Sequence, residues 1–348
     1  MMKIAISVGS AYYNGEDWED MLAYVEAADT MGIDSVWSAE AWGMDAVVAL
    51  GVLAGRTKNI QLGTGIMQIS ARTPASTSMT ALSLDRVSNG RFLLGLGASG
   101  PQVVEGLHGL PFAKPMSRMR EYVDIVRQAT AGERIQIEGE HYVLPRPGGE
   151  GKALRLSMPP KRIPIYLATL GVKSLEMTGE IADGWLGTSF IPEAADAHLA
   201  HIKKGAERAG RSLSDIEIEV NSTLAVSEDV EGLLNRARQG MAFTLGAMGS
   251  AKTNFYNDAF CRSGWEDVAK EVQGLWIGGD KKAAAEAVPD EMLLQAYLIG
   301  TEDRVRERIR AFRDAGVDVF RLSPQGRTSK ERIANLEYQA DLIRSETS

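Results

Sequence analysis

The sequence predicts an α/β protein of the (β/α)8-barrel class, a closed ring of parallel strands with helices outside. Short apolar runs alternate with amphipathic helical patterns along nearly all of the 348 residues, and the alternation occurs eight times. An open, doubly wound sheet is the competing prediction, but its opening glycine fingerprint does not follow the first strand. Barrels often exceed the usual domain size, so we expect one domain over residues 1–348.

Eight segments have the character of buried strands. Seven are short apolar runs bounded by glycine or polar residues, as expected for strands covered on both faces, and one alternates apolar with polar residues. In chain order they cover residues 3–8, 35–38, 60–66, 91–96, 164–168, 184–187, 216–226 and 317–322.

Helical patterns lie between these strands. In the first, Met21, Val25 and Ala28 form one apolar stripe, and Gly32 ends it. The third begins at Pro74, where the missing N–H costs nothing. We expect helices over residues 17–31, 44–55, 74–88, 116–131, 173–182, 194–209, 301–315 and 330–344. Residues 228–315 are expected to be mostly helical.

Two segments interrupt the alternation and are expected to be insertions. Residues 133–162 contain Glu138-Gly139-Glu140, which indicates a small hairpin, followed by a loop rich in proline and glycine. Residues 246–290 begin with an irregular part rich in glycine and aromatic residues. We expect both insertions to shape the substrate pocket.

Composition excludes several classes of protein. Thirty-eight Lys and Arg residues against 46 Asp and Glu give a net charge of −8, without the basic stripe of a nucleic-acid-binding protein. No run approaches the roughly 18 apolar residues of a membrane span, and the first apolar run is too short for a signal peptide. We therefore expect a cytoplasmic protein. Cys261 is the only cysteine, which excludes an intrachain disulfide.

The histidines do not predict a metal site. His198 and His201 lie three apart on one expected helix, but no third ligand accompanies them, so we interpret them as a solvated helix face. His108 is closer to the expected active site and could contact a substrate.

The active site of such a barrel lies at the C-terminal ends of its strands. This rule selects residues 7–13, 39–44, 65–72, 97–105, 168–173, 188–191, 221–223 and 323–327. Aromatic residues near these ends either seal the barrel or contact a planar ring. They are Tyr12, Tyr13, Trp37, Trp42, Trp185 and Phe190.

Two loops at strand ends favour a phosphate-bearing cofactor. The sequence Leu-Gly-Leu-Gly-Ala-Ser-Gly-Pro at residues 94–101 lets backbone N–H groups approach a phosphate, although such strand ends are also common as plain turns. The second loop, Ala-Thr-Leu-Gly at residues 168–171, opens a helix near Lys173, and a helix N-terminus suits an anion. The two loops follow neighbouring strands.

Two glutamates are candidate catalytic groups. Glu105 lies just beyond the first loop, and a carboxylic acid beside an apolar ring can donate a proton near neutral pH. The alternative is a solvated loop residue. Glu40 ends the second strand and could orient substrate, accept a proton or pair with an arginine such as Arg72.

The sequence resembles the luciferase-like superfamily, specifically its deazaflavin-dependent oxidoreductases. The resemblance covers nearly the whole chain, and its landmarks are specific only together. They are Ile-Gln-Leu-Gly-Thr-Gly-Ile (60–66), Ala-Arg-Thr-Pro (71–74), Leu-Asp-Arg-Val-Ser-Asn-Gly-Arg-Phe (84–92), residues 94–101, and Gly-Glu-Ile-Ala-Asp-Gly-Trp (179–185).

The resemblance implies an oxidoreductase that uses coenzyme F420. Similar enzymes have a non-prolyl cis peptide at the end of the third strand, which supports the deazaflavin ring, and here it would join Gly65 and Ile66. The residues implied to hold the phosphate are Ser99, Gly100, Leu170, Gly171 and Val172. The resemblance also implies a homodimer formed through outer helices, for which the apolar stripe of residues 44–53 would serve unless it only packs on the barrel.

Glu105 matches a glutamate assigned as proton donor in the sugar-phosphate dehydrogenase branch, after allowing one extra loop residue. That branch has an acidic residue followed by His after the second strand, whereas Glu40 is followed by Ala41. We therefore expect reduction of a C=N, C=C or C=O bond, with hydride leaving C5 of the deazaflavin, rather than alcohol oxidation. The alternatives are an FMN-dependent monooxygenase and a non-catalytic cofactor-binding homologue.

Overall fold

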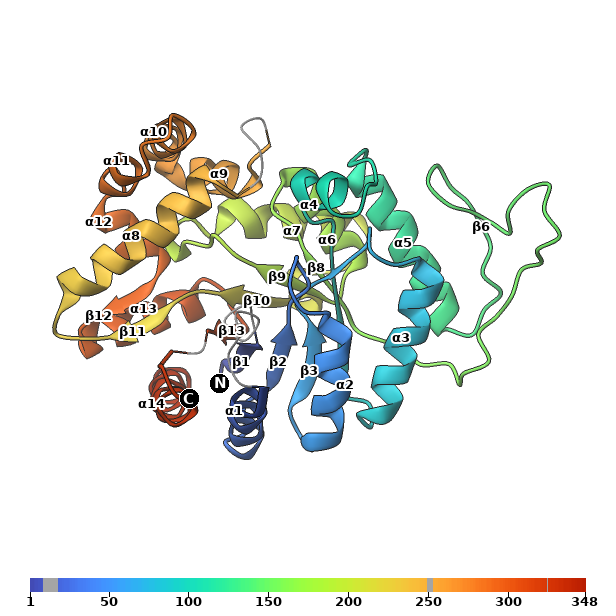
Figure 1. Ribbon diagram of the computed structural model, residues 1–348, viewed down its shortest axis with the longest axis horizontal. Coiled ribbons are helices and arrows are strands. Elements are labelled where there is room, and N and C mark those ends of the chain that lie inside the picture. Colours follow the sequence, from blue (N-terminus) through green and yellow to red (C-terminus); the bar gives the residue numbers. More distant parts are fainter. Residues whose placement is uncertain (9–17, 249–252, 324) are drawn as a thin grey trace. The chain divides into compact units, whose positions relative to one another are not determined.

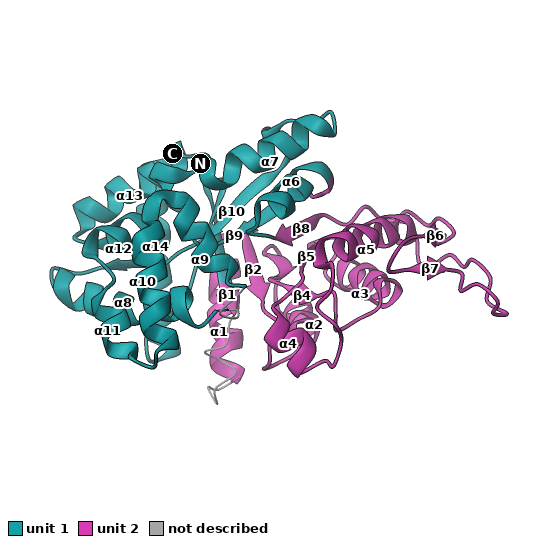
Figure 2. Ribbon diagram, turned by 90° about the horizontal axis from the view of Figure 1, so that it is seen from above, with its two compact units in different colours: residues 1–6, 169–180, 185–348 teal, residues 7–168, 181–184 magenta. Residues whose placement is uncertain are grey.

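The structure is a computed structural model that describes residues 1–8, 18–248, 253–323 and 325–348, in two compact units (Figures 1 and 2). Unit 1 contains Met1–Ile6, Thr169–Glu180 and Trp185–Ser348, and unit 2 contains Ser7–Ala168 and Ile181–Gly184. Tyr12 and Tyr13, which we expected near a strand end, lie outside the described residues.

Unit 2 alternates strands and helices as predicted. Its elements are α1 (Trp18–Thr30), β2 (Ser35–Ser38), α2 (Ala46–Arg56), β3 (Gln61–Thr64), β4 (Met67–Gln68), α3 (Pro74–Val87), β5 (Phe92–Gly97), α4 (Pro101–Gly106), α5 (Pro115–Thr130), β6 (Ile137–Glu138), β7 (Val143–Leu144) and β8 (Ile165–Ala168). Strand β2 pairs with β3, β3 with β5, and β5 with β4 and β8, and all these pairs are parallel.

Unit 1 has the same alternation, followed by a large helical region. Its elements are β1 (Lys3–Val8), α6 (Val172–Ile181), β9 (Gly184–Gly187), α7 (Asp196–Arg208), β10 (Glu217–Asn221), β11 (Leu224–Val226), α8 (Val230–Gly246), α9 (Phe255–Phe260), α10 (Glu266–Ile277), α11 (Lys281–Glu286), α12 (Asp290–Ala296), β12 (Leu298–Gly300), α13 (Glu302–Asp314), β13 (Val319–Leu322) and α14 (Ser329–Thr347). Short non-α helical turns occupy Pro192–Ala194, Leu213–Asp215 and Cys261–Trp265.

The strands form a closed parallel barrel. The hydrogen-bonded order is β3-β2-β1-β13-β10-β9-β8-β5-β4, and the additional pairing of β3 with β5 closes the sheet. Strands β1 and β9 each contain residues of both units. The predicted (β/α)8 barrel is confirmed, and the closure excludes the open, doubly wound sheet.

Aromatic side chains fill the interior of unit 2 below the strand ends. Trp37 on β2 is fully buried and stands opposite Gly63 on β3, where an added Cβ would lie 2.3 Å from the indole ring. The ring of Tyr166 on β8 meets Trp37 edge to face, with centroids 5.3 Å apart. Glycine at position 63 therefore makes the space that the large indole occupies.

The helices between β11 and β12 share a core of their own within unit 1. Buried apolar residues of α8, α10, α11 and α12 pack together, among them Leu245, Val272, Ala284 and Met292. A region without barrel periodicity therefore has its own buried core, in which each helix packs an apolar stripe against its neighbours.

The insertion at residues 133–162 carries the expected hairpin, in which β6 and β7 pair antiparallel. In Figures 1 and 2 it extends beyond α3 and α5 at the end of unit 2. The carboxylate of Glu121 on α5 anchors it by accepting hydrogen bonds from the backbone N–H groups of Glu140, His141 and Tyr142, at 2.8 to 2.9 Å.

Several elements differ from the prediction. The strand expected over 60–66 is shorter, because β3 ends at Thr64, before the turn at Gly65 and Ile66, and β4 follows at Met67–Gln68. The strand expected within 216–226 is divided into β10 and β11, which belong to different sheets. Strand β12 interrupts a region predicted to be helical, since three residues are too few to show a strand period. The loop expected over 97–105 contains α4, whose first residue is Pro101, a residue suited to the first helical position.

Candidate functional site

An ion-pair cluster lies at the C-terminal ends of β2 and β4 in unit 2. Nη1 of Arg72 donates to both carboxylate oxygens of Glu40, at 2.5 and 2.7 Å, and Nη2 pairs with Asp45. The side chains of Glu40 and Arg72 are only 11% and 18% exposed. Of the roles left open for Glu40, pairing with Arg72 is therefore present, and its carboxylate is not a free base.

Asp45 and Gln68 fix this cluster to the fold. Asp45 caps α2, because its Oδ1 accepts hydrogen bonds from the N–H groups of Val47 and Val48, both at 2.8 Å. Gln68, fully buried on β4, donates its backbone N–H to Glu40 at 3.0 Å. Its side-chain amide donates to the carbonyls of Glu40 and Ala41, at 3.2 and 3.0 Å, so one residue holds both the carboxylate and the turn that carries it.

The peptide bond between Gly65 and Ile66 is cis, as the resemblance implied. The backbone N–H of Gly65 donates to the carbonyl of Ser38 at 2.7 Å, and the carbonyl of Ile66 accepts from Glu40 N–H at 3.1 Å. Both residues are half-buried. The Ile66 side chain lies against Gly97 at the end of β5, where an added Cβ would come within 2.8 Å of it. Ile66 is thus a partly open apolar surface at the strand ends.

Ser99, Gly100 and Glu105 lie on the first expected phosphate loop and on α4. Ser99 has a left-handed backbone with φ of 59°, and Gly100 precedes the helix with φ of −119°. Both are half-buried, whereas Glu105 is exposed. The Glu105 carboxylate accepts a hydrogen bond from Phe112 N–H at 3.1 Å. Its surroundings are those of a solvated residue, close to the alternative that the sequence left open, although it lies on α4 and not in a loop.

Leu170, Gly171 and Val172 lie in unit 1, between β8 and the first turn of α6. The Nη2 atom of Arg262 donates to the Leu170 carbonyl at 2.5 Å. Thr169 accepts a bond from the indole N–H of Trp185 at 2.9 Å, which fixes the start of the loop to β9. The loop thus carries a cation that sequence analysis did not identify, because Arg262 is 92 residues away and belongs to no recognisable motif.

The interpretation of His198 as solvated is wrong. Its side chain is fully buried, with its ring 5.4 Å from that of Trp185 and 5.9 Å from that of Phe190, centroid to centroid. His198 is buried because it lies on the inward face of α7, together with Leu199, Ile202 and Ala206. Within the described ranges, no three His, Cys, Asp or Glu side chains are grouped to hold a metal.

The aromatic residues near the strand ends have different roles. Trp37, Trp185 and Phe190 are buried and close the interior, whereas the side chain of Trp42 is 73% exposed. Among the described aromatic residues of this set, Trp42 is the one open to solvent. It comes directly after Glu40 and Ala41, the two residues whose carbonyls Gln68 binds.

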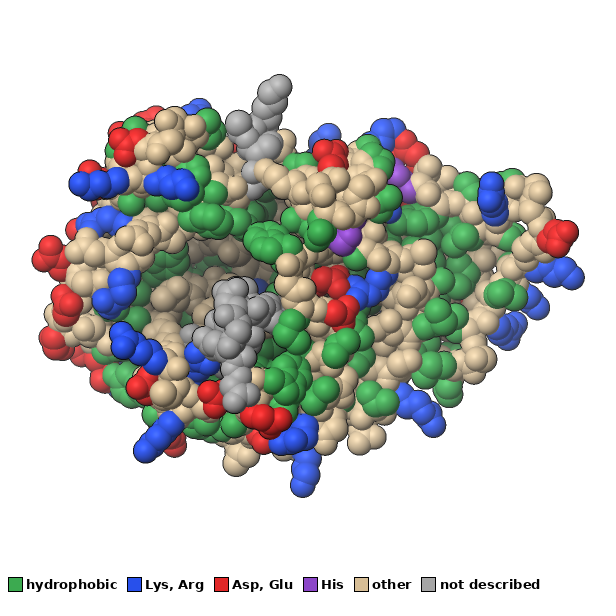
Figure 3. All heavy atoms as spheres, viewed as in Figure 1, with side chains coloured by type: hydrophobic (Ala, Val, Ile, Leu, Met, Phe, Trp, Pro, Cys, Tyr) green, Lys and Arg blue, Asp and Glu red, His purple; other side chains and the backbone are tan. Residues whose placement is uncertain are grey.

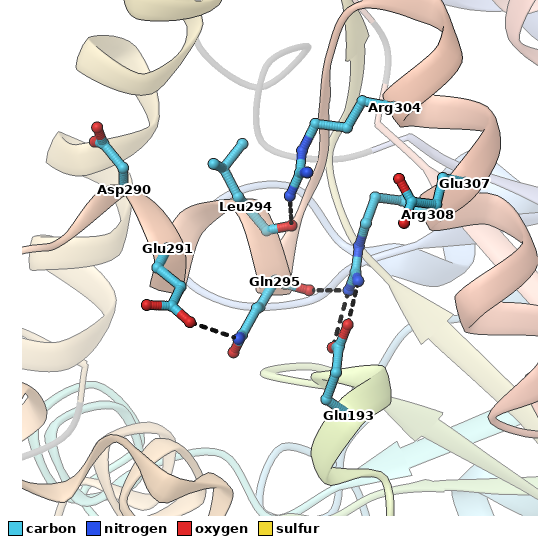
Figure 4. Close-up of a pocket in the computed structure, with 8 residues that line it drawn as sticks. All are labelled: Glu193, Asp290, Glu291, Leu294, Gln295, Arg304, Glu307 and Arg308. Atoms are coloured by element: carbon cyan, nitrogen blue, oxygen red, sulfur yellow. Dashed lines mark hydrogen bonds and ion pairs between the residues drawn. The ribbon is translucent and has the colours of Figure 1, made fainter.

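A separate cavity of about 510 Å³ lies in unit 1, between α12 and α13 (Figure 4). Arg308, itself 6% exposed, donates to Glu193 and to the Gln295 carbonyl, and Arg304 donates to the Leu294 carbonyl at 3.2 Å. None of the site residues expected from the sequence lines this cavity. Its lining of opposed charges gives it no single ligand chemistry.

Charged side chains of both signs are spread over the surface. Lysine and arginine side chains are interspersed with aspartate and glutamate over the face in Figure 3. Among the residues that the structure covers, no helix is both long and apolar enough to span a bilayer.

Comparison with known proteins matches residues 1–319 to the family of luciferase-like monooxygenases. A Mycobacterium tuberculosis protein named "Putative coenzyme F420-dependent oxidoreductase Rv3520c" is 40% identical over 328 residues, covering 92% of this chain and 94% of the relative. A 5,10-methylenetetrahydromethanopterin reductase of Archaeoglobus fulgidus is 30% identical over 312 residues, covering 89% and 91%.

The solved structures give the same fold. The coenzyme F420 dependent tetrahydromethanopterin reductase from Methanopyrus kandleri superposes with a TM-score of 0.77 over 97% of both chains, at 23% sequence identity. The family match covers all barrel strands up to the first residue of β13, with the strand-end cluster and both loops described above, and the 40% identity extends over nearly the whole chain. This chain therefore belongs to the luciferase-like monooxygenase family.

Proposed function

We propose that the protein is a coenzyme F420-dependent oxidoreductase that reduces a C=N, C=C or C=O bond of a small organic substrate. The observation that carries the proposal is Ile66, a partly open apolar side chain supported by Gly97 at the ends of β3 and β5. A flat ring needs such a surface, and the 40% identical relative is named for this cofactor.

The chain has groups suited to both parts of the cofactor, the ring and the phosphate. In unit 2 we assign Gly65 and Ile66 to the ring, and Ser99 and Gly100 to the phosphate. In unit 1 we assign Leu170, Gly171 and Val172, since a phosphate needs N–H donors and nearby positive charge, and Arg262 provides that charge at this loop. When bound, the deazaflavin supplies the hydride from C5.

We assign different roles to the two glutamates. Glu40 is a positioning residue, because its carboxylate is engaged by Arg72 and Gln68. Glu105 is the candidate proton donor; an exposed carboxylic acid can serve once a bound substrate covers it. The protein then contributes cofactor and substrate binding, their orientation and one proton.

A fluorescence titration of the purified protein with F420, and separately with FMN, tests the proposal. We expect micromolar binding of F420 and much weaker binding of FMN, followed by turnover of imines, enones or ketones with the reduced cofactor. In the Glu105→Gln variant, F420 affinity should persist while turnover falls about 100-fold, the lower range for loss of a general acid. Unchanged turnover would remove Glu105 from the mechanism.

Two other outcomes identify the rival functions. Tight FMN binding with oxygen uptake would indicate a monooxygenase, in keeping with the family's description. Tight F420 binding without turnover of any of the three substrate classes would indicate a non-catalytic cofactor-binding homologue.

We also propose that the protein is a homodimer that pairs through α2. The inward face of this helix packs in unit 2 with Ala49, Leu50 and Leu53, whereas Val48 and Val52 on the other face are 62% and 38% exposed. The exposed stripe is therefore additional to barrel packing.

A further inference from the structure

Arg262 is an unusual cation for its surroundings. It lies in the non-α turn Cys261–Trp265 that follows α9, in unit 1, and its side chain is half-buried. Nη1 donates to the Asp258 carbonyl at 3.2 Å and Nη2 to the Leu170 carbonyl. Both partners are neutral, and no carboxylate in the described part of the chain lies within 4.0 Å of the guanidinium.

The guanidinium also has an unsatisfied donor. Its Nε atom is buried and has no hydrogen-bond partner among the described residues. Burial lowers the pKa of Arg262 from its ordinary value, although the charge of Asp258 opposes the change. A partly desolvated cation without a carboxylate partner gains more from a bound anion than a surface arginine does, because water screens the interaction less.

The position of Arg262 indicates which anion it meets. Its direct partner is the carbonyl of Leu170, one residue before Gly171 and two before the first residue of α6. This is the loop that we assign to the phosphate on other grounds. Arginine suits phosphate because its fixed fork of N–H groups matches the phosphate oxygens.

We propose that Arg262 is a binding residue for the phosphate group of the cofactor's side chain. The inference rests on the proposed function and deepens it. The 246–290 insertion, which contains Arg262, then contributes to cofactor binding, as well as to the substrate pocket for which we expected it.

Two probes that differ only in the phosphate test the proposal. They are the deazaflavin chromophore with a bare ribityl chain and the same compound as its 5′-phosphate. In Arg262→Gln, affinity for the phosphorylated probe should fall roughly 10- to 100-fold, the range for a lost charge-assisted hydrogen bond. Affinity for the bare probe should not change. Arg262→Lys should recover part of the loss, since it restores the charge without the fork.

Arg211→Gln is the matched control. Arg211 donates to the carbonyls of Gly179 and Glu180 at the other end of α6, so the variant removes a guanidinium from the same helix far from the loop. We expect both probes to bind it as they bind the wild type. If Arg262→Gln weakens both probes equally, Arg262 only holds the loop, and the proposal fails. Unchanged binding of the phosphorylated probe would also overturn it.

A thermal-shift measurement with inorganic phosphate separates this inference from the proposed function. If the wild type binds neither deazaflavin, the F420 assignment fails. Phosphate that stabilises the wild type more than Arg262→Gln would then still support the anion site, and equal shifts would overturn it.

Discussion

His198 places a titratable ring among aromatic side chains. Neither ring nitrogen has a hydrogen-bond partner within the described residues, and Trp185 and Phe190 lie against the imidazole. Burial, aided by the charge of Arg262, lowers the pKa of His198 from 6.5 to about 3. Between these values the unfolded chain binds a proton that the folded protein does not, so stability falls as the pH decreases from about 6.5 towards 3.

Replacement of His198 by Phe should remove this pH dependence. We expect the wild type to lose about 2 kcal/mol more stability than His198→Phe when the pH is lowered from 7.5 to 5, since 1.5 pH units below 6.5 correspond to about that free energy. Urea unfolding of both proteins at the two pH values measures the difference. Parallel losses in the two proteins would show that His198 is not the group responsible.

At the scale of elements, the backbones of α6 and α7 lie in close contact at two glycines. Gly179 on α6 and Gly205 on α7 are both buried. A Cβ added to Gly179 would lie 2.0 Å from the Ile202 carbonyl oxygen, and one added to Gly205 would lie 1.8 Å from the Glu176 carbonyl oxygen. Backbone atoms cannot move aside as a flexible side chain can. The two glycines therefore set the distance between the helices.

Gly205→Ala should separate these helices and destabilise the protein by about 1–3 kcal/mol, the usual range for overpacking. Gly240→Ala is the matched control, because Gly240 lies inside α8 with no atom within 4 Å of the added Cβ. That variant should be more stable by about 1 kcal/mol, the helix propensity gained. Thermal melts measure the stability of both variants, and equal melting temperatures would contradict the close backbone contact at Gly205.

Apolar periodicity predicted the barrel elements because each strand has to be buried on both faces. It did not reveal β12 or α4, whose three and six residues are shorter than the patterns that identify strands and helices. It also misplaced His198, because a histidine carries no sign of which face of a helix it occupies.

The site could be predicted only where it depends on local sequence. The cis bond at Gly65–Ile66 was expected from the family resemblance, and the Glu40–Arg72 pair was one of three roles that the sequence left open for Glu40. The contributions of Gln68 and Arg262 depend on hydrogen bonds to distant backbone carbonyls, which no local pattern encodes.

For the whole molecule, the exposed face of α2 predicts the oligomeric state. Val48→Asp should convert the proposed dimer to a monomer at micromolar concentration, because two carboxylates would face each other across its two-fold interface. Leu154→Asp is the control, since Leu154 is 71% exposed in the 133–162 insertion. Sedimentation velocity should show that this variant remains dimeric. A monomeric wild type would contradict the proposal.

The pairing of the first strand with the last affects how the protein is made. Lys3 on β1 stands opposite Val319 on β13, 316 residues later in the chain. At a translation rate of about 5–20 residues per second, the first strand waits roughly 15 to 60 s on the ribosome for its partner. During that time its edge of unpaired backbone N–H and C=O groups is open to other chains, so newly made protein should depend on chaperones more than the finished barrel does.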